Sequence, residues 1–185
     1  MERKAKQLKP IVIFSDMAWA KIESLICFFD TEVQWHGVVE RKDKYLYIVK
    51  DILVPPHEVN GASVISDQTE YEEWLDSLTD EEFRGLKLHG HSHVRMDVIP
   101  SSVDVKYRLD RTSVLPTSGS ENSYYIFMII NKDWKLEMQI FDASTGTVYN
   151  KDDINIVTGS CMDDLVVIAD FIKDAYRKTN LLKGD

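Results

Sequence analysis

Two histidines separated by one residue, His91 and His93, are followed closely by Ser101 and Asp104. On a β-strand the side chains at i and i+2 leave the same face, and the Leu-Lys-Leu run at 86–88 predicts such a strand. Imidazole nitrogens and carboxylate oxygens bind zinc, and three protein ligands with the fourth position left to water are typical of a catalytic zinc site. The residues therefore predict a zinc site held by His91, His93 and Asp104.

A helix is expected to begin at Ser101, because Pro100 stands directly before residues of the type that cap helices. Ser101 and Asp104 are then three residues apart on the first turn, so both side chains can face the same point. The strand and the helix start would thus bring the two imidazoles and the carboxylate together.

Two further histidines leave the ligand set open at this stage. A His-x-His pair alone is more often exposed or hydrogen-bonded than metal-binding, and the nearby serine and aspartate favour the metal. His89 lies two residues before the pair, and its participation stays open. His57 follows two prolines in an expected loop, where a histidine is usually exposed to solvent rather than a ligand.

The full pattern resembles the JAMM motif of the JAB1/MPN/Mov34 metalloprotease family: His-x-His at 91–93, seven residues, Ser101, two residues and Asp104. In that family the motif also includes a glutamate at the start of the strand that follows the first helix. Glu32 stands in the corresponding place, and the resemblance covers about residues 11–142 in element order.

The resemblance implies a role for each matching residue. Zinc would activate a water, Glu32 would accept its proton and deliver it to the leaving amine, and Ser101 would donate to the oxyanion. Glu40 and Glu58 are rivals for the base, but neither has the same helix-to-strand setting. Because the family cleaves peptide or isopeptide bonds after the tail of ubiquitin or a ubiquitin-like protein, the resemblance implies a deubiquitinase-like metalloprotease with such a substrate. A zinc hydrolase of a small molecule or short peptide, and a non-catalytic scaffold of the same family, remain as alternatives.

Three positions depart from the family's usual pattern. Val94 stands where a proline often follows the second histidine, and His89-Gly90 stands where an aromatic residue often precedes the first. Trp35 occupies the place of a common glycine three residues after Glu32. None of these departures removes a ligand.

The composition excludes several classes of protein. The net charge of −9 argues against binding to a phosphate backbone, which relies on lysine and arginine, and suits a basic protein partner. No apolar run approaches the ~20 residues of a membrane span, and the charged start lacks the apolar core of a signal peptide, so a cytoplasmic location is expected. Cys27, expected on an apolar helix face, and Cys161, with no histidine close by, are too few for a zinc cage and are expected to stay reduced. The oligomeric state stays open.

Strand patterns that alternate with helix patterns predict one α/β domain over residues 1–185, with a single mixed sheet flanked by helices on both sides. The resemblance narrows this to a JAB1/MPN-like, cytidine-deaminase-like architecture. A loop without regular structure is expected at 55–67 and a polar loop at 111–122, and in the resembled family such segments flank the site. The expected strands are 10–14, 33–39, 45–54, 124–130 and 136–141, with a turn at 41–43. The expected helices begin after a cap at Ser15 or Asp16, span about 69–83 with a restart at the capping-box pattern 79–82, follow residue 101 and span about 161–178.

Overall fold

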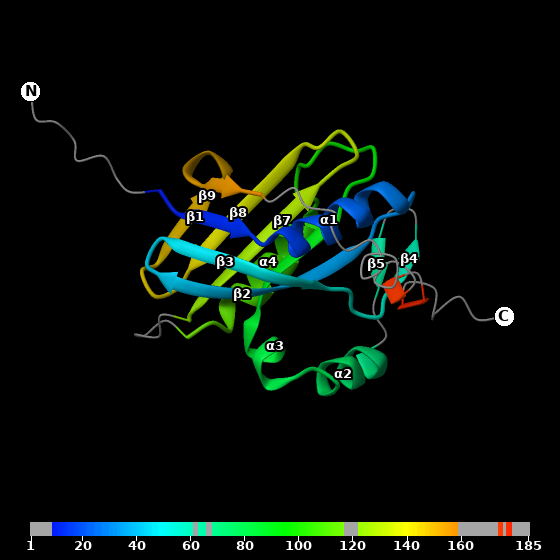
Figure 1. Ribbon diagram of the computed structural model, residues 1–185, viewed down its shortest axis with the longest axis horizontal. Coiled ribbons are helices and arrows are strands. Elements are labelled where there is room, and N and C mark those ends of the chain that lie inside the picture. Colours follow the sequence, from blue (N-terminus) through cyan, green and yellow to red (C-terminus); the bar gives the residue numbers. More distant parts are fainter. Residues whose placement is uncertain are drawn as a thin grey trace, which may run out of the picture.

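The computed structural model describes residues 9–60, 63–65, 68–116, 122–158, 174–175 and 177–178, with the side chains of 58–60 and 63–65 left aside. An eight-stranded mixed sheet carries the fold (Figure 1). Its strand order is β10-β1-β3-β2-β6-β7-β8-β9, with β1 parallel to β3 and β10, β6 parallel to β7, and the other pairs antiparallel. The predicted α/β class with one mixed sheet is confirmed. The strands are β1 (Ile11–Phe14), β2 (Gln34–Asp43), β3 (Leu46–Leu53), β6 (Leu86–Ser92), β7 (Tyr124–Ile130), β8 (Leu136–Asp142), β9 (Thr147–Asn150) and β10 (Asn155–Val157).

Helix α1 (Asp16–Phe28) covers one face of the sheet. Ser15 caps it by accepting a hydrogen bond from the Ala18 backbone N–H at 3.1 Å, which decides between the two caps, Ser15 and Asp16, that the sequence allows. Its buried face packs into the main core with alternate residues of β7, which is buried along its whole length. A strand buried on both sides requires cover on both faces of the sheet. The members of this core that come from α1 and β7 are Ala18, Ile22, Leu25, Ile26, Tyr124, Ile126, Met128 and Ile130.

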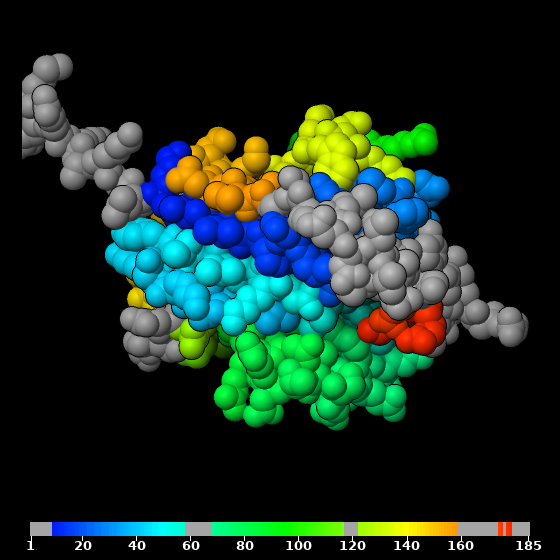
Figure 2. All heavy atoms as spheres, viewed as in Figure 1, coloured from blue at the N-terminus to red at the C-terminus, as the bar shows by residue number. Residues whose placement is uncertain are grey.

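The other face is covered by α2 (Gln68–Asp76), α3 (Asp80–Gly85) and α4 (Ser102–Ser113). Trp74 of α2 packs with Val38 of β2 and Leu86 of β6 in a second, smaller core. In the space-filling view the green and teal atoms of α2 and α3 lie against the cyan atoms of β2 and β3 (Figure 2). Tyr107 of α4 lies over the sheet, with its ring 4.5 Å from that of His89. The prediction of helices on both sides is therefore confirmed.

One prediction about helix boundaries is confirmed and one needs correction. The helical pattern over 69–83 has a capping-box sequence at 79–82 that predicts a restart, and the structure confirms it, because Thr79 forms a capping box with Glu82 and α3 begins there. The polar loop expected over 111–122 begins only after α4 ends at Ser113, and residues 117–121 lie outside the described residues. Of the final helix expected over 161–178, only 174–175 and 177–178 are described, and these are helical.

Two predictions about strands also need correction. The loop expected over 55–67 contains regular structure, since β4 (Glu58–Asn60) pairs antiparallel with β5 (Ser63–Ile65); the Asn-Gly signal is typical of hairpins as well as loops. The turn expected at 41–43 is part of β2, where Arg41 is held by an ion pair of 2.8 Å to Asp142 of β8. Strands β9 and β10 were not predicted.

Two further observations concern the cysteines and the membrane. Cys27 is exposed rather than packed on an apolar face, and Cys161 lies outside the described residues. Within the part of the chain that the structure describes, no helix combines the length and apolarity needed to cross a bilayer.

Candidate metal centre

Strand β6 carries the two histidines into the middle of the sheet, between β2 and β7. His91 pairs with Gln34 of β2 on one side and Ile129 of β7 on the other. His93 lies one residue beyond the strand, but its backbone N–H still donates to the Ile130 carbonyl at 2.9 Å. The i, i+2 spacing therefore places both imidazoles on the face that α4 covers, as predicted.

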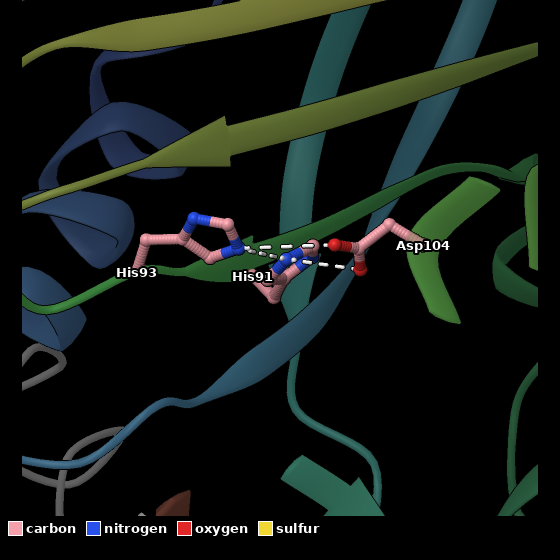
Figure 3. A group of neighbouring side chains, drawn as sticks. All are labelled: His91, His93 and Asp104. Atoms are coloured by element: carbon pink, nitrogen blue, oxygen red, sulfur yellow. Dashed lines mark hydrogen bonds and ion pairs between the residues drawn. The ribbon is translucent and has the colours of Figure 1, made fainter. Parts of the chain in front are cut away.

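The first turn of α4 supplies the carboxylate. Asp104 and Ser101 form a capping box, in which the Asp104 N–H donates to the Ser101 hydroxyl at 3.2 Å and the Ser101 N–H donates to Asp104 Oδ2 at 2.7 Å. The helix start expected at Ser101 is confirmed. The same bonds fix the carboxylate, which points at the two imidazoles (Figure 3).

The three side chains converge at distances that suit a metal ion. Nε2 of His91 lies 3.1 Å from Nε2 of His93 and 3.3 Å from Oδ1 of Asp104. Nε2 of His93 lies 3.8 Å from Oδ2 of the same carboxylate. A tetrahedral site with bonds of about 2.0–2.1 Å places its ligand atoms roughly 3.3–3.4 Å apart. The buried His91–His93–Asp104 group can therefore hold a metal ion.

The orientation of His93 is fixed by a hydrogen bond on its far side. Its Nδ1 lies 2.7 Å from the Asp97 backbone carbonyl, to which it can only donate. In the neutral ring Nε2 then carries the lone pair that faces the site. Such partners on the outer nitrogen are usual for metal-binding histidines and set the ring tautomer.

The protonation states of His91 and Asp104 also suit metal binding. Burial lowers the pKa of His91 to about 4, although Asp104 opposes the shift, so this ring is neutral at pH 7. Burial disfavours the charge on Asp104, but its contacts with His93, His91 and Ser101 outweigh that and lower the pKa of the carboxyl. The hydrogen bond to Asp104 raises the pKa of His93, so a metal ion must compete with a proton at this ring. A neutral imidazole and an ionised carboxylate are the forms that bind zinc.

Glu32 lies between α1 and β2, in the helix-to-strand setting that the sequence indicates. It lines the same cavity, of about 280 Å³, but is not one of the three converging ligands. Burial raises the pKa of its carboxyl, with a smaller opposing effect from His93 and a further increase from Asp104. Glu32 is therefore placed in the same cavity as the three converging side chains. The cavity is lined by Glu32, Gln34, His89, His91, His93, Met96, Asp97, Ile99, Ser101, Val103, Asp104 and Tyr107.

Ser92, the middle residue of the His-x-His pair, ties Glu32 to the histidines. Its hydroxyl accepts from the Val33 N–H at 3.0 Å, and its own N–H donates to the Val33 carbonyl at 2.9 Å. These bonds hold the residue next to Glu32 against the end of β6, beside His91 and His93. This role of Ser92 was not predicted, and its only sign in the sequence is the place of the serine between the two histidines.

The rival residues lie elsewhere. Glu40 pairs with Lys42 and with Lys50 of β3 in a different groove, and the Glu58 side chain is outside the described set. His57 is fully buried, contrary to the expected exposure. Its Nε2 accepts from the Gln34 N–H at 3.3 Å, and its Nδ1 lies 2.7 Å from the Pro55 carbonyl. Both ring nitrogens of His57 are thus occupied, which excludes it as a ligand.

His89 lines the cavity without joining the ligand group. Its ring packs 4.5 Å from that of Tyr107 and 5.5 Å from that of His36. Three apolar residues at the cavity, Met96, Ile99 and Val103, were not predicted as part of the site. The signal that could have found them is their position: Met96 and Ile99 lie between His93 and α4, and Val103 lies in the first turn of α4.

No protein-family model matches this sequence, and a search of curated proteins finds no match. The family resemblance is thus carried by the five motif residues alone.

Proposed function

We propose that the protein is a zinc-dependent metallopeptidase that hydrolyses a peptide or isopeptide bond after a ubiquitin-like C-terminal tail. The observation that supports this most strongly is the convergence of His91, His93 and Asp104 in a cavity that also contains Glu32. When bound, zinc lowers the pKa of its water from 15.7 to about 7 and thereby supplies a nucleophile at neutral pH.

Glu32 is the general base and acid in this proposal. Amide hydrolysis needs a group that accepts a proton from the attacking water and later delivers it to the leaving nitrogen as the C–N bond breaks. Burial raises the pKa of the Glu32 carboxyl toward the working pH, which favours both steps. Because Glu32 is not one of the three proposed ligands, it can change its protonation state without releasing the metal.

Ser101 stabilises the oxyanion that forms when water adds to the carbonyl carbon. Its oxygen accepts from the Asp104 N–H, and its hydroxyl also interacts with the Asp104 carboxylate. In this proposal the hydroxyl hydrogen turns from that carboxylate to the oxyanion when the substrate is bound. One such donor contributes on the order of 3 kcal/mol in other hydrolases.

The substrate class and the finer fold are part of the same proposal. The order α1, Glu32, β2, the histidines of β6 and the Ser101–Asp104 turn of α4 agrees with the JAB1/MPN-like, cytidine-deaminase-like architecture. Strands β4 and β5 form a separate two-stranded sheet, and an exposed strand edge is a common binding site for an extended peptide tail.

A zinc hydrolase of a small molecule or short peptide is the second candidate. The size of the cavity favours it, because about 280 Å³ is close to the lower end of the ~300–1,000 Å³ typical of small-ligand pockets. A non-catalytic scaffold is less well supported, since all five motif residues are present.

The test is a cleavage panel with the zinc-loaded protein: fusions after a ubiquitin-like tail, unrelated unfolded peptides and small amides. We expect selective cleavage of the fusions, and Glu32→Gln should keep its zinc while losing about 10²–10⁴-fold in kcat. Glu40→Gln, a carboxylate in the other groove, is the matched control and should retain the full rate. Cleavage of small amides alone would favour the second candidate, and metal loss in Glu32→Gln would show that the base has been misassigned.

A further inference from the structure

Exposed apolar side chains surround the mouth of the cavity that contains the candidate metal centre. Met96 and Ile99, between β6 and α4, are 52% and 70% exposed, and Val103 on the first turn of α4 is 71% exposed. All three line the cavity. Single exposed apolar residues are ordinary on a protein surface, whereas several around one functional cavity form a contact surface for a ligand.

The charged side chains that line the cavity are acidic. The carboxylates of Glu32, Asp97 and Asp104 line it, and no lysine or arginine does so among the residues that the structure describes. An acidic side chain at the mouth would lose its hydration against three apolar side chains, and only the proposed metal ion would offer it a positive charge. The cavity mouth therefore suits an apolar side chain and disfavours an acidic one.

We propose that Met96, Ile99 and Val103 are specificity-determining residues that bind an apolar side chain at the residue following the scissile bond. This inference rests on the proposed function. The tail of the proposed substrate ends in small residues, which leave these three side chains largely uncovered. The substrate side chain that covers them must then come from the segment that hydrolysis releases.

The strength of this preference follows from the burial of apolar surface. A substrate with leucine after the scissile bond would cover the three side chains, whereas serine would leave them in water. Differences of this kind in an apolar pocket are worth about 10–200-fold in kcat/KM.

The test uses three fusions with the same ubiquitin-like tail, followed by leucine, serine or aspartate. The wild type should prefer leucine over serine by roughly tenfold or more in kcat/KM, and should cleave the aspartate fusion slowest. Ile99→Ser and Val103→Ser should bring the leucine-to-serine ratio close to one. Val105→Ser changes a residue of α4 that is also exposed but does not line the cavity, and should keep the wild-type ratio.

A binding measurement separates this inference from the proposed function. The Kd of zinc-loaded Glu32→Gln for the uncleaved leucine and serine fusions should differ by a similar factor and in the same order. Equal Kd values for the two fusions, or the same loss of ratio in Val105→Ser as in Ile99→Ser, would overturn the inference. Absence of turnover for every fusion by the wild type would overturn the proposed function, while the Kd comparison still decides the inference.

Discussion

Trp35 of β2 lies directly opposite Gly90 of β6, and a Cβ added to Gly90 would come within 2.3 Å of Trp35 Nε1. These are two of the three positions at which the chain departs from the motif it resembles. Trp35 stands where the motif often has a glycine, and Gly90 belongs to the pair that stands where an aromatic residue is common. The large side chain on β2 thus occupies the space that the glycine leaves on β6. Because His91 follows Gly90 in β6, this contact also sets the position of a candidate ligand.

Gly90→Ala should destabilise the protein, since the methyl group meets the indole ring and β6 must shift. Overpacking of this kind typically costs about 1–3 kcal/mol, measurable by urea unfolding, and zinc affinity should fall with it. Trp35→Leu combined with Gly90→Ala is the control, because removal of the indole makes room for the methyl group. The double variant should be more stable than the sum of the single changes predicts, and strict additivity would contradict the account.

Ser101→Ala should reduce both stability and turnover, and α3 offers a matched control for the first effect. Thr79 caps α3 with the same pair of bonds, to Glu82, that Ser101 forms with Asp104 in α4. Loss of either cap should cost about 1 kcal/mol of unfolding free energy. Only Ser101→Ala should also lower kcat, by roughly 10²–10³-fold. Equal kcat values for Thr79→Ala and Ser101→Ala would rule out the oxyanion role.

The unfolding free energy should decrease as the pH falls from about 6.5. Burial lowers the pKa of His36 to about 3 and that of His57 to about 4. In the unfolded chain these imidazoles take up a proton near pH 6.5, whereas in the folded protein they do so only at the lower values. The unfolded state therefore binds more protons in this window, and each histidine contributes a loss of about 1.4 kcal/mol per pH unit.

The measurement is urea unfolding between pH 7 and pH 4.5. His57→Gln is the control, because an amide can still accept from the Gln34 N–H and donate to the Pro55 carbonyl but does not titrate. This variant should lose stability less steeply with falling pH than the wild type. An unchanged slope would show that His57 is not held neutral by burial.

The candidate ligands could be predicted because their geometry is local. The i, i+2 spacing on a strand and the i, i+3 spacing at a helix start place His91, His93 and Asp104 without knowledge of distant contacts. The burial of His57 could not be predicted, since it depends on bonds to Gln34 and Pro55 made in the folded chain. The same is true of β10. Among the described strands it comes last in the sequence, yet it pairs with β1, the first.

Metal analysis of the purified protein tests the central claim most directly. We predict about one zinc per chain in the wild type, and loss of that zinc in His91→Ala and in His93→Ala. His57→Gln, a change at a buried histidine outside the ligand group, should keep the wild-type content. A wild-type protein that binds no zinc, or His91→Ala with full occupancy, would contradict the assignment of the His91–His93–Asp104 group as a metal centre.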